Sequence, residues 1–270
     1  MLKDITIGQY FPGESAIHRL DPRMKLIMTT IYIVALFVAN NVGGLLVCVA
    51  IGLAGYLISG ISLSMVKKSL KPIMPIIIFT AVLNMIFVDG KPIFEFWIIK
   101  ATYEGLQLAV LMVIRIVCLI AGSSLLTYTT SPIALTDAVE RLFDPLKKFN
   151  MPVHELAMMM TIALRFIPTL IEETDKIMSA QKARGADMES GTIIDRARAL
   201  IPILIPLFVS SFRRADELAL AMECRCYHGG EGRTRMKQLK YTGNDFVALA
   251  VLVMVLALVI AMNLILPSMY

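Results

Sequence analysis

Residues 246–266 read FVALAVLVMVLALVIAMNLIL, a run of 21 residues without a charged side chain. A helix needs about 20 apolar residues to cross the hydrocarbon core of a bilayer, which is roughly 30 Å thick. The rest of the chain is similar, because 57% of the 270 residues are hydrophobic, whereas soluble domains are roughly 45–50% apolar. The sequence therefore predicts an integral membrane protein.

Four more spans are expected upstream of this run. The charge-free stretch 26–58 is too long for one span, and Asn40-Asn41-Val42-Gly43-Gly44 within it is typical of a turn. The expected fold class is all-α, with about five transmembrane helices and two or three long cytoplasmic amphipathic helices. The expected spans cover residues 24–40, 43–61, 72–88, 105–128 and 246–266.

The distribution of basic residues predicts the topology. Lys67, Lys68 and Lys71 form a loop without an acidic residue, and residues 129–245 hold 16 of the 26 Lys and Arg residues. Basic loops stay on the cytoplasmic side, so we interpret the net charge of +5 as topology rather than nucleic-acid binding. We expect a multi-pass plasma-membrane protein with a cytoplasmic N terminus. Its expected parts are residues 1–128 with four spans, 129–245 in the cytoplasm, and 246–270 with the last span.

Residues 129–245 contain three expected helices. Ser131-Pro132 is typical of a helix start, and this helix is expected to end near Phe143. The second starts after Asn150-Met151-Pro152 and ends at Gly185, and the third covers about 192–227. The two long helices are too hydrophobic for water and too charged to span. We therefore expect them to lie on the membrane surface or against partner proteins.

Two arginines end similar stretches of these long helices. An Asp precedes both Arg184 and Arg225 by nine residues, an Ile or Leu by seven, and an Ala by four. One arginine at a helix C terminus gains about 0.3–1 kcal/mol from the helix dipole and needs no other role. Two arginines in repeated contexts with small neighbours favour docking instead, because a guanidinium can form two parallel bonds with a carboxylate. Two similar tips predict two similar grooves, as in a dimeric or pseudo-dimeric partner.

Arg115 lies in the middle of the fourth expected span. It is either a structural residue that pairs with an acid or a carbonyl inside the bundle, or part of an ion or substrate path. No expected span contains an acidic residue, so the sequence favours the structural role.

Signals of catalysis are missing from the sequence. It has no P-loop motif and no recognisable set of catalytic residues. Cys224 and Cys226 form a lone C-x-C without the second ligand pair that a zinc site needs. We expect no enzymatic activity, no cofactor and no metal site.

Five short motifs connect the sequence with a known family. They are Leu20-Asp21-Pro22-Arg23-Met24-Lys25-Leu26, Thr129-Thr130-Ser131-Pro132, Arg165-Phe166-Ile167-Pro168, Ala183-Arg184-Gly185 and Tyr227-His228-Gly229-Gly230-Glu231-Gly232-Arg233-Thr234-Arg235. Together they resemble the transmembrane T component of energy-coupling factor (ECF) transporters, the EcfT or CbiQ-like family. The resemblance covers nearly the whole chain.

The resemblance implies a subunit without chemistry of its own. In this family the T component joins two ABC-type ATPases to a membrane-embedded S component that captures a vitamin or metal ion, and helix tips of the form X-Arg-X dock on the ATPases. The tips here would be Ala183-Arg184-Gly185 and Cys224-Arg225-Cys226, and the second differs by having Cys on both sides. The family also implies an apolar platform for the S component, and our candidates share one helical face: Leu156, Met159, Met160, Ala163, Leu164, Ile167, Leu170 and Ile171.

Two other functions stay open on the sequence alone. An independent secondary transporter or channel would need intramembrane acids, broken helices or repeated spans, and only Arg115, Asn84 and some prolines point that way. A membrane-bound enzyme would need a nucleophile or metal set that the sequence does not show. The cargo is not written in this chain, because in the family the S component selects it.

Overall fold

The chain divides into two compact units in the computed structural model. The membrane unit comprises Gly8–Ala138 and Leu239–Tyr270, and the second unit comprises Val139–Gln238 with Met1–Ile7. We call the second unit the α8–α9 unit after its long helices α8 (Val153–Ala183) and α9 (Ile193–Glu223). Residues 230–235 of the motif that begins at Tyr227, and Leu266 at the end of the last expected span, lie outside the described residues. The structure describes residues 10–88, 92–96, 99–149, 151–186, 192–229 and 238–265.

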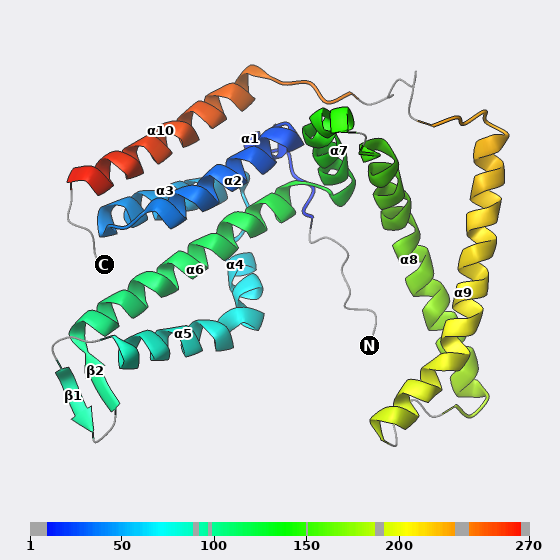
Figure 1. The fold of residues 1–270 in the computed structure, drawn as a ribbon, viewed down its shortest axis with the longest axis horizontal. Helices are drawn as coiled ribbons and strands as arrows, with labels where there is room; N and C mark the ends of the chain where they lie inside the picture. Colours follow the sequence, from blue (N-terminus) through cyan, green and yellow to red (C-terminus); the bar gives the residue numbers. More distant parts are fainter. Residues whose placement is uncertain are drawn as a thin grey trace. The chain divides into compact units, whose positions relative to one another are not determined.

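The expected spans form helices close to their predicted bounds, so the prediction of an all-α membrane protein is confirmed (Figure 1). These helices are α2 (Pro22–Val38), α3 (Val42–Ser59), α5 (Met74–Phe87), α6 (Tyr103–Thr129) and α10 (Gly243–Ile265). The short helix α1 (Ala16–Arg19) precedes α2, while α4 (Leu63–Leu70) and η1 (Lys71–Ile73) lead into α5. The chain is thus a multi-pass membrane protein.

Length and hydropathy identify five runs among the described residues as able to cross a membrane: Val42–Ser59, Ser64–Phe87, Tyr103–Thr129, Val153–Ala183 and Gly243–Ile265. Four of them overlap expected spans, and the helix of the remaining expected span, α2, is shorter at 17 residues. The fifth run is α8, which we had judged too charged to span. Helix α8 meets this criterion of length and hydropathy because its charges concentrate in its second half.

A β-hairpin joins α5 to α6, where the sequence alone does not decide between strand, loop and helix. Strands β1 (Pro92–Phe96) and β2 (Ile99–Thr102) pair antiparallel. The hydroxyl of Thr102 at the end of β2 donates to the carbonyl of Val88 (2.6 Å) and accepts from the N–H of Gly105 (3.1 Å). One side chain therefore ties α5, the hairpin and the first turn of α6 together.

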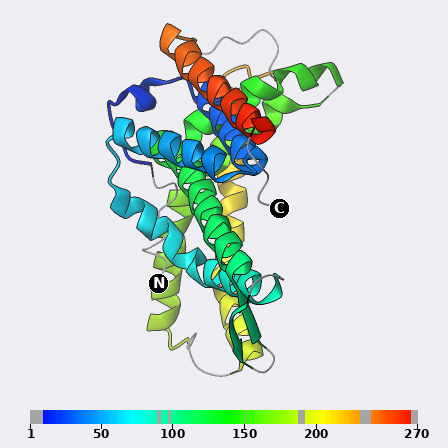
Figure 2. The same ribbon diagram turned by 90° about the vertical axis from the view of Figure 1, so that its left-hand side faces the viewer.

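The core of the membrane unit lies where α2, α3, α6 and α10 pack together (Figures 1 and 2). Its buried residues include Tyr32, Leu36, Cys48 and Val259. Gly122 of α6 admits the aromatic ring, because a Cβ atom there would lie 2.5 Å from Tyr32. The Tyr32 hydroxyl donates to the carbonyl of Cys48 (3.2 Å), so its burial leaves no polar group unsatisfied.

Polar side chains hold the turn between α2 and α3 against the end of α10. The Asn41 side chain donates to the carbonyl of Met262 (3.1 Å), and the Asn40 N–H donates to Asn263 Oδ1 (3.2 Å). The Asn263 side chain in turn donates to the carbonyl of Val38. The turn that separates two spans in the sequence is therefore also an attachment point for the last span.

The three helices expected between residues 129 and 227 are present. They are α7 (Pro132–Phe143), which has both predicted ends, α8 (Val153–Ala183) and α9 (Ile193–Glu223), with η2 (Asp144–Phe149) between α7 and α8. Pro168 lies inside the continuous helix α8, and Pro202 and Pro206 lie inside α9. Thr192 and Asp195 form a capping box at the start of α9, and the hydrogen bond from the Thr192 hydroxyl lowers the pKa of Asp195.

Candidate functional site

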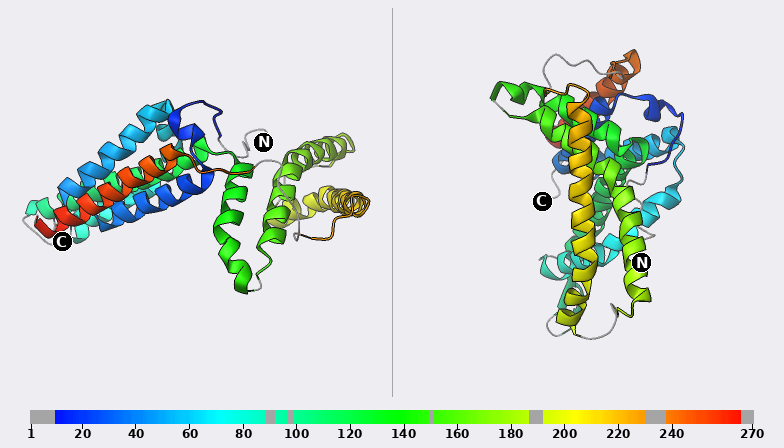
Figure 3. Two further views of the ribbon diagram at one scale, coloured as in Figure 1. Left: turned by 90° about the horizontal axis from the view of Figure 1, so that it is seen from above. Right: turned by 90° about the vertical axis from the view of Figure 1, so that its right-hand side faces the viewer.

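The two long helices run in opposite directions and cross (Figures 1 and 3). Near the crossing, Arg214 of α9 forms an ion pair of 2.7 Å with Glu173 of α8, and the Ser210 hydroxyl donates to the same carboxylate. Further along, the Gln181 side chain donates to the carbonyl of Pro202 (3.3 Å). Residue numbers fall on one helix as they rise on the other, which establishes the antiparallel register.

The ion pair joins equivalent positions of the sequence repeat. Glu173 precedes Arg184 by eleven residues, and Arg214 precedes Arg225 by eleven residues. At 1.5 Å per residue, each arginine lies about 16 Å along its helix from this ion pair. Because the helices are antiparallel, the two arginines lie at opposite ends of the crossed pair, up to about 33 Å apart. The repeat in the sequence thus produces a crossed pair with two tips at opposite ends.

Helix α8 ends in a Schellman cap with Arg184 as its last half-helical residue. The Ala186 N–H donates to the carbonyl of Gln181 (3.0 Å), and the Gly185 N–H donates to the carbonyl of Lys182 (3.0 Å). Gly185 has a φ of 86°, the left-handed conformation that this cap requires and that glycine adopts without strain. The prediction that Gly185 ends this helix is confirmed.

Helix α9 ends in the same cap with Arg225 in the matching position. The Tyr227 N–H donates to the carbonyl of Met222 (3.1 Å), and the Cys226 N–H donates to the carbonyl of Glu223 (2.8 Å). Cys226 takes the place of glycine, with a φ of 54°. The two X-Arg-X segments therefore share a backbone conformation although the residues beside the arginines differ.

The caps leave both arginine side chains available. Backbone N–H groups already satisfy the last carbonyls of each helix, so neither guanidinium is needed as a cap. Arg184 and Arg225 are exposed, as are Ala183 and Cys224 before them. Within the described part of the chain, neither arginine side chain forms a hydrogen bond or ion pair. This exposure is what a docking role requires.

The candidate platform on α8 is only partly open. Leu156 is 51% exposed, Met159 54% and Met160 49%, and Ala163 is also exposed. The other four candidates are half-buried: Leu164, Ile167, Leu170 and Ile171. The first half of the predicted face is therefore available for a partner, and the second half is partly covered.

A family model described as cobalt transport protein (CbiQ) matches residues 13–236, which include both arginine tips. The chain belongs to the CbiQ family. This confirms the family that the sequence motifs indicated.

Similar proteins extend over almost the whole length of this CbiQ-family chain. The energy-coupling factor transporter transmembrane protein EcfT of Clostridium kluyveri is 57% identical over 250 residues, covering 92% of this chain and 93% of the relative. The EcfT protein of Thermosediminibacter oceani is 56% identical, covering 92% of this chain and 93% of the relative. The EcfT protein of Ruminiclostridium cellulolyticum is 52% identical, covering 97% of this chain and 98% of the relative.

An apolar face on α9 was missed in the sequence analysis. Its residues are exposed at helical spacing: Ile201, Leu204, Ile205, Phe208 and Phe212. Their spacing of i, i+3, i+4 and i+7 is typical of one helix face, whereas Pro202 and Pro206 in the same stretch are typical of a disturbed helix. The structure keeps α9 continuous through both prolines, so this CbiQ-family chain has a second apolar helix face beside that of α8.

Arg115 contacts the backbone of a neighbouring span. Its guanidinium donates to the carbonyl of Ala39, at the C-terminal end of α2. A cation at a helix C terminus interacts favourably with the helix dipole. This contact supports the structural role that we propose for Arg115. Among the described residues, no group of three His, Cys, Asp or Glu side chains is placed to hold a metal ion.

Proposed function

We propose that this protein is the transmembrane energy-coupling subunit of an ECF-type ABC importer. It transmits ATP-driven motion of two ATPase subunits to a membrane-embedded S component, for uptake of a vitamin or another micronutrient. Family membership and the names of the relatives support the class of transporter. The coupling role rests on one observation, the two capped and exposed arginines at opposite ends of a crossed helix pair.

Each tip fits a groove on a separate ATPase subunit. The tips lie at opposite ends of the crossed pair, up to about 33 Å apart, so one groove cannot take both. A homodimer or heterodimer of ATPases offers two related grooves, and a guanidinium can bind a carboxylate in each with two parallel bonds. The small residues on either side of each arginine allow close approach of the two backbones.

The crossing converts motion of the ATPases into motion of the platform. ATP binding closes the ATPase pair and brings the two bound tips together. Because the tips belong to helices joined at Glu173 and Arg214, this movement changes the crossing angle of α8 and α9. The apolar faces of both helices then shift beneath the S component and help it to reorient and release its cargo.

This function requires α8 and α9 to lie along the cytoplasmic surface. A spanning pair would place its two tips on opposite sides of a bilayer core roughly 30 Å thick, so only one could reach a cytoplasmic ATPase. It would also place the Glu173–Arg214 ion pair in hydrocarbon. The many basic residues of 129–245 support the same topology, with this region and the N terminus in the cytoplasm.

Copurification followed by transport in proteoliposomes tests the proposal. The wild-type chain is expected to bring down two ATPase subunits and an S component. The double variant Arg184→Ala, Arg225→Ala is expected to lose the ATPases and transport, while the isolated S component still binds cargo. Removing a buried charge partner weakens binding by roughly 2–5 kcal/mol. Arg213→Ala removes an exposed arginine of α9 away from the tips and is the matched control.

Normal assembly and transport by the double variant would contradict the role of the tips. Transport by the chain alone in liposomes would show an independent secondary transporter instead.

A further inference from the structure

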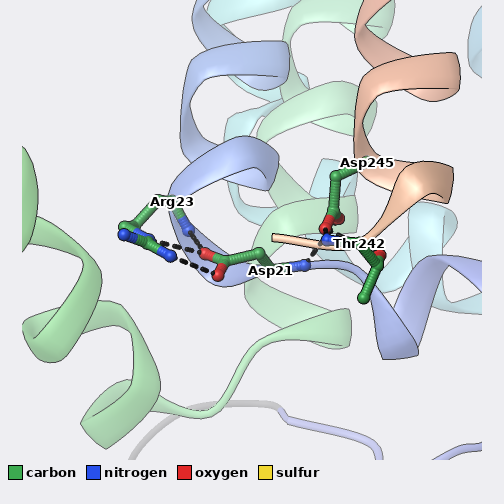
Figure 4. A network of polar contacts seen from close by, with 4 residues as sticks. All are labelled: Asp21, Arg23, Thr242 and Asp245. Carbon is green, nitrogen blue, oxygen red and sulfur yellow. Dashed lines mark hydrogen bonds and ion pairs between the residues drawn. The ribbon is translucent and has the colours of Figure 1, made fainter. Parts of the chain in front are cut away.

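A buried ion pair lies at the start of α2. The Arg23 guanidinium donates through Nε to Asp21 Oδ1 (3.0 Å) and through Nη2 to Asp21 Oδ2 (2.8 Å) (Figure 4). The same carboxylate caps α2 by accepting from the Arg23 backbone N–H (2.9 Å). The two side chains are only 9% and 1% exposed, so this is an internal contact of the membrane unit.

A second carboxylate joins this pair to the start of α10. The Asp21 N–H donates to Asp245 Oδ1 (2.8 Å), across 224 positions of the sequence. The other oxygen of Asp245 accepts from the N–H (2.7 Å) and the hydroxyl (2.8 Å) of Thr242 (Figure 4). Asp245 is fully buried, and it fixes the turn before α10 and the turn before α2 to one another.

Two further contacts extend this network. The Arg23 guanidinium lies 3.8 Å from the ring centroid of Tyr241, a cation–π contact. Lys25 donates to the carbonyl of Thr129 at the end of α6 (2.9 Å) and to the carbonyl of His18 (3.0 Å). We call Asp21, Arg23, Lys25, Tyr241 and Asp245 the clamp. It joins the start of α2, the end of α6 and the start of α10.

The end of α6 and the start of α10 lie close in sequence to the points where the chain leaves the membrane unit, after Ala138, and returns to it, at Leu239. After Thr129 the chain enters α7 and passes into the α8–α9 unit, and it comes back at Leu239, just before Tyr241. A buried ionic network is weak evidence for stability, because apolar residues of similar size often stabilise a fold as well. Its best-supported use is to fix one geometry among several.

We propose that the clamp positions both connections between the α8–α9 unit and the spans, so that movement of the coupling helices reaches the spans without loosening the connecting segments. This proposal rests on the proposed function, because it needs an ATP-driven movement to transmit. Asp21, Arg23 and Asp245 act as positioning residues. All three are buried in the membrane unit, so their role is to hold its geometry and not to bind a partner.

The experiment measures cargo uptake and ATP hydrolysis together, with the complete complex in proteoliposomes. Tyr241→Leu removes the ring beneath Arg23 but leaves both buried carboxylates paired. We expect it to lower cargo uptake per ATP hydrolysed about five-fold or more, in the range of coupling effects between distant sites, with assembly and hydrolysis retained. Tyr241→Phe keeps the ring and is expected to keep the normal ratio. Asp245→Asn breaks the central connection and is expected to lower the ratio further.

Exposed charges nearby give the matched control. Glu14→Ala and Arg19→Ala break an ion pair whose side chains are 90% and 72% exposed, and the uptake ratio is expected to stay normal. An unchanged ratio in Tyr241→Leu, or a fall of uptake and hydrolysis in equal proportion, would overturn the positioning role. A wild-type complex that assembles without ATPases would overturn the proposed function and the clamp with it.

Discussion

The ends of α8 and α9 share one backbone cap but differ in the residue that adopts its left-handed conformation. At α8 this residue is Gly185, for which a φ of 86° is unstrained. At α9 it is Cys226, with a φ of 54°, and no other non-glycine residue in the described ranges has a positive φ. For a residue with a Cβ atom this conformation costs roughly 1–2 kcal/mol.

The α9 end therefore forms the same cap as the α8 end although Cys226 disfavours the left-handed conformation that the cap requires. The shared feature is the backbone geometry, which places each arginine directly before the left-handed residue of the cap and satisfies the last helix carbonyls through backbone N–H groups. We therefore expect the two tips to bind equally but to differ in local stability.

The largest effect should come from reversing the charge of each tip separately. Arg184→Glu and Arg225→Glu are each expected to weaken ATPase binding by roughly 2–5 kcal/mol, because attraction at one groove becomes repulsion. Titration of the purified ATPases into the chain measures this loss, with Arg213→Glu as the control. A large loss at one tip and none at the other would show that the ends are not equivalent.

A smaller effect should come from exchanging the residues in the left-handed position. Gly185→Ala is expected to speed hydrogen exchange at the Ala186 amide, and Cys226→Gly to slow it at the Tyr227 amide. Each change should be about 5- to 30-fold, which corresponds to the 1–2 kcal/mol of left-handed strain. Mass spectrometry of exchange in nanodiscs measures both. If both substitutions speed exchange, or both slow it, Cys226 is not strained relative to Gly185 and the comparison of the two caps is contradicted.

The smallest effect should come from the crossing itself. A double-mutant cycle of Glu173→Ala and Arg214→Ala is expected to give a coupling energy of about 0.5–1 kcal/mol in thermal unfolding, because both side chains are partly exposed, at 21% and 33%. Lys147 with Asp144, at 49% and 44% exposure, is the control pair with coupling near zero. Because Glu173 and Arg214 lie on different helices, loss of their ion pair should change amide hydrogen exchange equally at the α8 cap and at the α9 cap. A change at one cap alone would show that the ion pair does not link the two helices.

Much of the fold could be predicted because it depends on local patterns. Charge-free runs gave the spans, and Ser131-Pro132 with Gly185 gave helix ends that the structure confirms. The arginine repeat located both tips. The left-handed Cys226 could not be foreseen, because nothing in its own neighbourhood favours that conformation.

Contacts between distant residues were beyond the sequence for a different reason. The hydrogen bond from Asp21 to Asp245 spans 224 positions, and one sequence contains no periodic signal at that separation. The Asp-Pro-Arg motif at residues 21–23 is recognisable as a family feature, but no local pattern indicates that Asp245, directly before the last expected span, accepts a hydrogen bond from Asp21. The hairpin between α5 and α6 was also undecided, since its capping depends on Thr102 reaching Val88.

The central claim is that the two tips contact two ATPase subunits. A photo-reactive amino acid at position 183 or, in a second variant, at position 224 tests it directly in the assembled complex in native membranes. Both variants should crosslink to an ATPase subunit, since Ala183 and Cys224 are exposed beside the arginines. Crosslinks from both positions only to lipid or to the S component would contradict the claim.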